Sequence, residues 1–230
     1  MKKSKRVRAF VDFFKRSESY SLEEALQILK KAPSVRFDET VDLSLCLGVD
    51  PKKSDQKVKG SFLFPHGTGM SVSVVVLAKD ENVQLALDAG AELAGDEEVV
   101  DKILSGWVDF SVLIATPDMM RSVGKLGKVL GPRGLMPTLK GGTVSADVAR
   151  AVKEAKMGKI SFQSDKNGVI NVPVGKLSFS AESLKENVNL FIEEVVRLKP
   201  PAAKNYLNSM VISSTMGPGV RLKSDVAADV

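Results

Sequence analysis

Reactive and metal-binding side chains are scarce in this sequence. Its 230 residues include one cysteine, Cys46, and one histidine, His66. A single cysteine excludes an intrachain disulfide framework, and these two residues are too few for a Cys/His metal centre. His66 lies between Pro65 and Gly67, and no motif places a serine or cysteine nucleophile beside it. We therefore expect no catalytic residue, no metal site and no cofactor.

Long apolar runs are also absent. No stretch approaches 18 apolar residues, and the basic start MKKSKRVRAF is not followed by an apolar segment of the kind found in secretion signals. We expect a cytoplasmic protein with no membrane contact. Hydrophobic residues make up 43% of the chain, which is enough for a buried core. The net charge of +5 indicates an anionic partner only weakly.

The two ends of the chain predict the same kind of secondary structure, amphipathic helices with short or half-buried strands. A helix is predicted over Ser21–Ala32, because Ser21 and Glu24 form a capping box and Pro33 follows. Alternating apolar residues from Thr40 predict a half-buried strand. Near the other end we expect short strands at 160–164 and 168–174 joined as a hairpin by the turn DKNG, a long amphipathic helix before Pro200, and a final strand at 209–213.

The middle of the chain follows a different pattern. Nearly continuous apolar strands at 72–78 and 112–115 alternate with helical stretches at 83–89, 97–104, 117–129 and 146–156. Strands and helices that alternate in this way predict a parallel sheet covered on both faces.

The change from half-buried strands in the flanks to buried strands that alternate with helices in the middle predicts two domains and an α/β fold class. We expect a discontinuous α+β first domain with a mixed or antiparallel sheet, residues 1–67 plus 160–230. A Rossmann-like α/β domain with a parallel sheet, residues 68–159, is inserted in it. Glycines at the two crossings, Gly67 and Gly158, predict a hinge near 66–69 and 157–160. A single continuous α/β domain is the alternative.

The glycine-rich stretch VLGPRGLMPTLKGGTV does not match a nucleotide-binding motif. Its glycines and lysines lack the spacing of a phosphate-binding P-loop. The first strand-to-helix turn of the α/β segment carries Asp80 and Glu81, where a dinucleotide pyrophosphate needs neutral amides. A nucleotide-dependent enzyme built on this segment is kept as the alternative function.

Charge is distributed unevenly along the α/β segment. Residues 80–109 contain nine acids and one base, whereas residues 119–146 contain five bases and no acid. Bases on a glycine-rich backbone can approach phosphates closely, so this loop is a candidate nucleic-acid contact. A solvated lid explains the same charges equally well, and the acidic stretch alone would suit a protein-interaction module.

Two short stretches of the flanks suit RNA recognition. VRFDET places Phe37 beside Arg36, where an exposed ring could stack on a base, although a buried ring fits equally well. SSTMGPG, residues 213–219, combines hydroxyls with Gly217, so that its backbone can approach RNA closely, although these residues alone favour a simple polar turn. A basic arm, Lys2 to Arg8, precedes the first helix.

Taken together, these stretches resemble the family of bacterial large-subunit ribosomal protein one, the stalk protein beside the tRNA exit site. The resemblance covers nearly the whole chain and is carried by FDETVDLSLCLGVDPKKSDQ, LFPHGTG, LIATPDMM, LGPRGLMPTLKGGTV, FQSDKNGVINVPVGKLSF and STMGPGVR. It implies a non-enzymatic protein whose split first domain binds the ribosomal RNA stalk. It also implies assistance in the release of deacylated tRNA and repression of the protein's own operon messenger. We expect a monomer when the protein is free.

The resemblance also assigns residues to the RNA surface. One side would consist of Arg36, Phe37 and Thr40, and the other of Ser209, Ser213, Thr215, Met216 and Gly217. Lys166 and Asn167 of the DKNG turn would approach the RNA backbone. The glycine-rich loop becomes a secondary RNA contact through Lys125, Lys128, Arg133 and Lys140.

Overall fold

The computed structural model describes residues 15, 17–33, 35–50, 53, 56–79, 81–139, 141–201 and 206–223. The basic arm at Lys2 to Arg8, Asp80 of the first strand-to-helix turn, and Lys140 of the glycine-rich loop lie outside the described residues.

The chain divides into two compact units. The first is Met1–Val58, Phe64–Gly69 and Phe162–Val230, and the second is Lys59–Leu63 and Met70–Ser161. The α/β fold class with a discontinuous first domain and an inserted second one is confirmed. Lys59–Leu63 differs from the expected bounds, because this segment forms strand β2 and pairs with β6 (Lys159–Gln163). The hinge stays a prediction.

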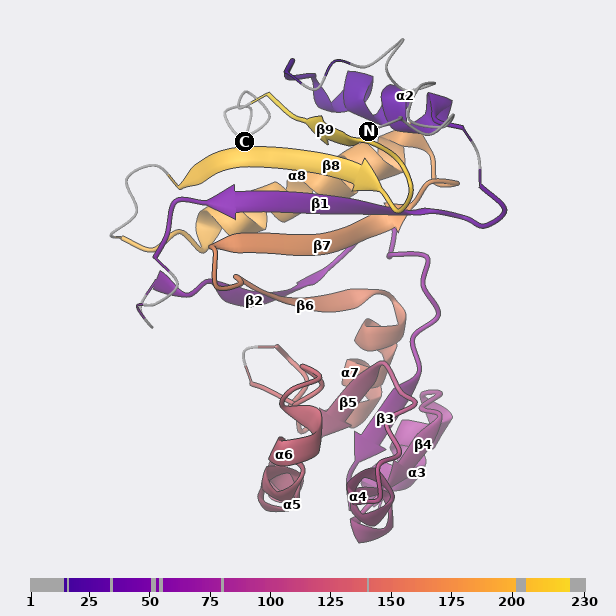
Figure 1. Ribbon diagram of the computed structural model, residues 1–230. Helices are drawn as coiled ribbons and strands as arrows, with labels where there is room; N and C mark the ends of the chain where they lie inside the picture. The colour runs from indigo at the N-terminus through magenta and orange to yellow at the C-terminus, as the bar shows by residue number, and fades with distance from the viewer. Residues whose placement is uncertain are drawn as a thin grey trace. The chain divides into compact units, whose positions relative to one another are not determined.

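The first unit is built on a four-stranded antiparallel sheet. Its order is β7 (Val169–Lys176), β1 (Thr40–Leu47), β8 (Leu207–Ser214) and β9 (Gly219–Arg221). The predicted alternation in β1 is confirmed, since Val41, Leu43, Leu45 and Leu47 are buried and the residues between them are not. Figure 1 shows helix α8 (Ala181–Arg197) behind this sheet, and helix α2 (Leu22–Lys31) packs against α8 and β8.

The capping box that begins α2 is present as predicted. The Ser21 hydroxyl accepts a hydrogen bond from the Glu24 amide at 3.3 Å, and the Glu24 carboxylate accepts one from the Ser21 amide at 2.9 Å. Leu184, Val188, Phe191, Ile192 and Val195 form the buried stripe of α8 expected from their spacing.

The predicted hairpin across the DKNG turn is wrong. The turn itself forms, since the Asp165 carboxylate accepts hydrogen bonds from the amides of Asn167 and Val169, each at 2.8 Å. The strands that it joins then separate, because β6 pairs with β2 and β7 pairs with β1. Local turn chemistry set the reversal of the chain, whereas the partner of each strand came from distant segments. The last strand is β9 rather than β8.

The second unit contains a three-stranded parallel sheet in the order β4 (Leu93–Gly95), β3 (Val74–Leu77) and β5 (Val112–Ala115). Both of its faces are covered, as the continuous apolar runs predicted. Val75, Leu77 and Leu113 pack in a cluster with residues of α4 (Glu97–Leu104). Val74, Val76 and Ile114 pack with residues of α3 (Glu81–Asp88) and α7 (Val148–Lys156).

The helix predicted from Pro117 to Val129 is broken into three pieces. A 3-10 turn at Pro117–Met119 is followed by α5 (Met120–Lys125) and α6 (Gly127–Leu130). Met119, Val123, Leu126 and Leu130 have helical spacing and are all buried, which explains the prediction. Gly124 and Gly127 weaken the helix between them, because glycine loses more backbone entropy than other residues.

We expect Phe191→Ala to destabilise the first unit strongly. The Phe191 ring lies 5.9 Å from that of Phe64 and 5.0 Å from that of Phe162, and all three rings are buried. Truncation should lower the free energy of unfolding by about 3 to 5 kcal/mol, measured by urea denaturation. In the control, Phe37→Ala, a change beyond about 0.5 kcal/mol would contradict this account, because the Phe37 side chain is exposed.

Candidate nucleic-acid interface

The segment that enters β1 is anchored by its acids, while Arg36 and Phe37 remain exposed. The Asp38 carboxylate accepts hydrogen bonds from the Ser178 amide at 3.2 Å and from the Ser178 hydroxyl at 2.7 Å. Phe37 is 54% exposed, so the buried alternative for this ring is wrong. These hydrogen bonds anchor the backbone next to an exposed aromatic ring, and the preceding residue, Arg36, is exposed as well.

The TMGPG loop is anchored to the same segment. Glu39 is buried, and its carboxylate accepts a hydrogen bond from the Met216 amide at 2.9 Å. The Met216 side chain is left 52% exposed. At Gly217 the loop passes close to Ser214, so a Cβ placed there would collide with the Ser214 hydroxyl. A bulky residue at position 217 would therefore disturb the loop itself.

Thr40 and Thr215 join the two segments. The Thr40 amide donates to the Thr215 hydroxyl at 3.1 Å, and the Thr215 amide donates to the Thr40 carbonyl at 3.0 Å. The Lys176 ammonium donates to the Thr40 hydroxyl at 2.9 Å. An exposed ring, an exposed thioether, hydroxyls and a cation thus meet at one end of β1.

The structure divides the predicted RNA residues between the two ends of the sheet. Thr40 is opposite Lys176, whereas Cys46 is opposite Val169 and Ser209. Six residues of strand at about 3.3 Å each separate the two ends by roughly 20 Å. The near end holds Arg36, Phe37, Thr40, Thr215, Met216 and Gly217. Ser213, opposite Asp42, lies two residues further along the sheet. The far end holds Ser209, Lys166 and Asn167.

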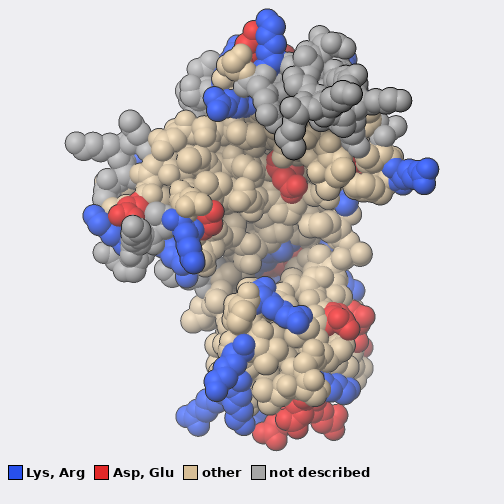
Figure 2. Space-filling view, in the orientation of Figure 1, with Lys and Arg blue, Asp and Glu red and all other residues tan. Residues whose placement is uncertain are grey.

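A polar face connects these two ends. Between the buried residues of β1 stand Asp42, Ser44 and Cys46, and Ser213, Val211 and Ser209 lie opposite them on β8. Figure 2 shows this face with few charged side chains and an acidic patch over β1. Among the described residues, no helix packs on it. A face rich in hydroxyls and poor in positive charge suits sugars and base edges better than phosphates.

Three residues of this site were missed by the sequence predictions. Lys176 joins it only because the register of β7 sets it opposite Thr40, and no local signal indicates that pairing. Glu39 and Asp42 lie in the FDETVD stretch, where alternation could have shown Asp42 on the open face. The burial of Glu39 has no such signal.

The second unit carries the basic loop. Lys125, Lys128 and Arg133 are exposed, and none of them forms an ion pair with another described residue. Figure 2 shows basic side chains over α5 and α6 and acidic ones over α4. The predicted separation of charge in the sequence thus becomes a separation on the surface of this unit.

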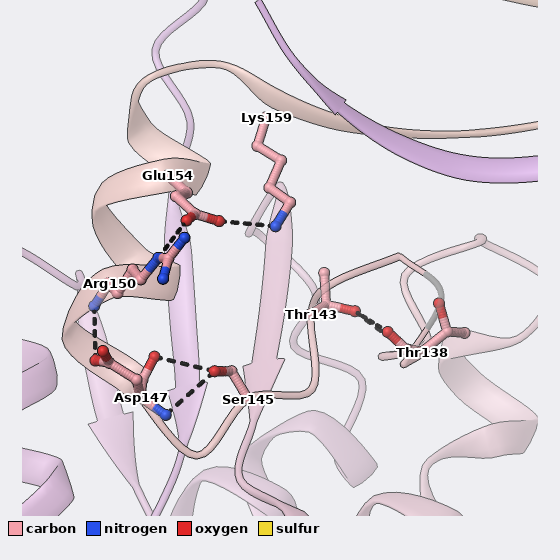
Figure 3. Close-up of polar contacts among 7 residues, drawn as sticks. All are labelled: Thr138, Thr143, Ser145, Asp147, Arg150, Glu154 and Lys159. Atoms are coloured by element: carbon pink, nitrogen blue, oxygen red, sulfur yellow. Dashed lines mark hydrogen bonds and ion pairs between the residues drawn. The ribbon is translucent and has the colours of Figure 1, made fainter. Parts of the chain in front are cut away.

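The glycine-rich loop is closed by its own hydrogen bonds. The Thr138 amide donates to the Thr143 hydroxyl at 2.9 Å, and that hydroxyl donates to the Thr138 carbonyl at 3.2 Å (Figure 3). Nearby, Glu154 accepts from Lys159 and from Arg150, each at 2.8 Å. These contacts with Lys159 and Arg150 lower the pKa of the Glu154 carboxyl. The hydrogen bonds between Thr138 and Thr143 therefore hold the glycine-rich loop in a defined conformation.

A cavity of about 80 Å³ lies beside this loop. It is lined by residues of β5, by Gly134–Met136 and Gly141–Thr143, and by Lys159–Ser161. Nucleotides in α/β folds bind beyond the carboxyl ends of the strands. This cavity instead extends along β5 from Ser111, before its first residue, to Ile114.

His66 is held by helix α8. Its Nε2 atom lies 2.7 Å from the Glu186 carboxylate, and its amide donates to the buried Asn187 at 3.4 Å. No cluster of three or more His, Cys, Asp or Glu side chains that could hold a metal was found within the described ranges. The helices described are too short or too polar to cross a membrane.

Comparison with known proteins places this arrangement in a family. Residues 29–218 match the model of the ribosomal protein L1p/L10e family, a range that includes both ends of the polar sheet face. The chain belongs to the ribosomal protein L1p/L10e family. It is 54% identical over 220 residues to large ribosomal subunit protein uL1 of Chlamydia caviae, with 95% of each chain covered.

Other members of the L1p/L10e family are similarly close. The uL1 protein of Protochlamydia amoebophila is 52% identical over 98% of this chain and 97% of its own length. That of Chlorobaculum tepidum is 51% identical over 91% of each. All three bear the name of a large-subunit ribosomal protein, which supports a structural ribosomal role for this chain.

We expect Thr215→Val to lower the stability of the near end of the sheet. Valine keeps the shape of threonine but neither accepts from the Thr40 amide nor donates to the Thr40 carbonyl. The free energy of unfolding should fall by about 0.5 to 1.5 kcal/mol in urea denaturation. Ser209→Ala removes an exposed hydroxyl from strand β8, which Thr215 follows, and should change the free energy of unfolding by less than about 0.5 kcal/mol. Equal losses in the two variants would count against the Thr40–Thr215 junction.

Asp42 should make stability fall as the pH rises. Burial raises the pKa of the Asp42 carboxyl, and the charge of Lys176 opposes the shift. The folded state therefore binds this proton more tightly than the unfolded state, and the resulting stabilisation is lost as pH rises through the folded pKa. Asp42→Asn should remove this dependence and be no less stable than the parent at pH 7. A urea series from pH 3 to pH 7 measures it, and an unchanged pH dependence would contradict the prediction.

Proposed function

We propose that this protein is a non-enzymatic, cytoplasmic component of the large ribosomal subunit whose first unit binds the RNA stalk at the tRNA exit site. The observation that supports it most is the pair of exposed side chains, Phe37 and Met216. Each extends from a backbone segment that a hydrogen-bonded acid anchors, Asp38 for Phe37 and Glu39 for Met216, at the end of a polar sheet face. Family membership supplies the ribosomal context.

Recognition on this face would depend on shape and hydroxyl contacts. The Phe37 ring stacks on a base or ribose, and the Met216 thioether packs beside it. Hydroxyls of the open face lie within reach of ribose 2′-hydroxyls. Lys176 at the near end and Lys166 at the far end contact phosphates, and together they orient the RNA along the strands.

The basic loop of the second unit would contribute a secondary contact. Lys125, Lys128 and Arg133, which form no ion pair with another described residue, offer positive charge to a phosphate backbone, and Lys140 continues that stretch in the sequence. With the stalk bound, the protein assists release of deacylated tRNA. The same sheet face would bind a similar structure in the protein's own operon messenger and repress its translation.

A nucleotide-dependent enzyme on the second unit is the competing function. It requires a phosphate site after β3 or β5, whereas α3 begins there with Glu81 and the cavity lies along β5. A titration with ATP or NAD distinguishes the two, because saturable binding would favour the enzyme.

We expect Phe37→Ala and Met216→Ala to weaken binding to a transcribed stalk fragment while leaving the fold unchanged. Loss of one stacking contact costs about 1 to 3 kcal/mol, so the Phe37 variant should bind roughly 5- to 150-fold more weakly. Met157→Ala is the control for Met216, because Met157 is an exposed methionine of the second unit. Binding is measured by fluorescence anisotropy, with an unrelated hairpin beside the stalk fragment.

Salt dependence tests the mode of binding. Few phosphate contacts predict a shallow slope, at roughly −0.7 to −0.9 in log K per contact. Weak binding that is equal for both RNAs and abolished by moderate salt would contradict the proposal.

A further inference from the structure

Strand β5 forms one edge of the three-stranded parallel sheet in the second unit. Its register with β3 sets Val112 opposite Val74, and the Val112 amide donates to the Ser73 carbonyl at 3.1 Å. Along a strand, the backbone groups of successive residues point alternately to its two neighbours in the sheet. The N–H and C=O groups of Leu113 therefore point away from β3, toward the outer edge.

The outer edge of β5 is paired only at its carboxyl end. The Ala115 amide donates to the Thr143 carbonyl at 3.0 Å, and the Ser145 amide donates to the Ala115 carbonyl at 3.2 Å. No described residue forms a hydrogen bond with the backbone of Leu113 on that side, although Leu113 is buried. The cavity of about 80 Å³ lies beside Leu113. Buried backbone groups are rarely left without a partner, so this N–H and C=O are available to a ligand.

Apolar side chains bound the cavity on both sides of the sheet plane. Met136 belongs to the cluster that covers the face of Leu113, whereas Ala151 and Ala155 of α7 belong to the cluster on the opposite face. All three line the cavity. The two alanines are small, so they leave space next to β5. A thin, planar group that continues the plane of the sheet fits between these walls.

The charges around the cavity favour a neutral group inside it and an anion outside it. The Lys159 ammonium, which lines the cavity, donates to the Glu154 carboxylate at 2.8 Å, so its charge is compensated (Figure 3). Arg133 precedes the lining residue Gly134, is exposed, and forms no ion pair with another residue of the described ranges. A nucleotide whose base is inside and whose phosphate is outside has this distribution of charge.

A single base meets these conditions better than an extended peptide. The free edge presents the backbone groups of one residue, because Thr143 occupies the position beside Ala115, and a strand needs about three residues or more. One base edge supplies a donor next to an acceptor. A cavity of about 150 Å³ encloses a benzene ring. This smaller one, bordered by exposed Ser111 and Ser161, suits a pyrimidine that enters by its edge and leaves its sugar outside.

We propose that this cavity binds one unstacked pyrimidine of RNA, whose base edge forms hydrogen bonds with the N–H and C=O groups of Leu113. This inference rests on the proposed function, in which the basic loop contacts RNA. The base lies between Met136 and the alanines of α7, and Arg133 contacts the adjoining phosphate. Uracil donates from N3 and accepts at O4, whereas cytosine donates from its amino group and accepts at N3. Both therefore match one N–H and one C=O.

The first test observes the Leu113 amide directly. The full-length protein is titrated with hexauridylate, hexacytidylate, hexaadenylate and an acidic hexapeptide, and its backbone amides are followed by NMR. With a pyrimidine RNA, the Leu113 signal should shift and its hydrogen exchange should slow about tenfold, because the amide gains an acceptor. The Ile114 amide faces β3 and should change little.

Three results of this titration would overturn the proposal. They are a Leu113 amide that responds to none of the probes, one that responds most strongly to hexaadenylate, and one that responds to the acidic peptide but to no RNA. The last would assign the edge to a protein partner. Failure of the protein to prefer the stalk fragment over an unrelated hairpin would instead overturn the proposed function.

The second test fills the cavity. Ala151→Leu places an apolar side chain in it, whereas Ala149→Leu adds the same side chain at a half-buried position of α7 outside the lining. Ala151→Leu should bind hexauridylate about tenfold more weakly and lose the Leu113 response, while Ala149→Leu should stay within about twofold of the parent. Thermal unfolding checks that both variants fold. A folded Ala151→Leu protein that keeps the Leu113 response would contradict a site in this cavity.

Discussion

The pairing of β1 with β7 on one side and β8 on the other organises the first unit. These three strands come from the two ends of the chain, and their register sets Thr40 against both Lys176 and Thr215. The same register turns Val41, Leu43 and Leu45 into the core and Asp42 and Ser44 onto the open face. A shift of one residue would exchange the two faces, so the buried side chains of β1 also determine which side chains the surface presents.

The adjacent acids Asp38 and Glu39 form hydrogen bonds that anchor the backbone and leave the side chains of Phe37 and Met216 exposed. Asp38 holds the segment before β1 through Ser178, and buried Glu39 holds the TMGPG loop through the Met216 amide. The two exposed hydrophobic side chains of the near end, Phe37 and Met216, therefore extend from anchored backbone. An interface held in this way loses little conformational entropy when a partner binds. The second unit differs, because its basic loop is closed by its own hydrogen bonds and presents positively charged side chains.

Sequence patterns predicted elements well where the signal was local. The capping box of Ser21 and Glu24 located the start of α2, and alternation identified the buried side of β1. Continuous apolar residues identified the covered strands β3 and β5. Predictions failed where partners were distant or where signals conflicted: the DKNG turn formed without a hairpin, and Gly124 and Gly127 broke a helix that apolar spacing favoured.

By itself the sequence determined the fold class, the separation of acidic from basic stretches in the middle of the chain, and the motifs of the family. These depend on neighbours along the chain or on the periodicity of a single element. Only the tertiary structure decided that Phe37 is exposed, that Glu39 is buried, and that Lys176 lies opposite Thr40. Each of these depends on contacts or strand register between segments more than a hundred residues apart, and no local propensity encodes them.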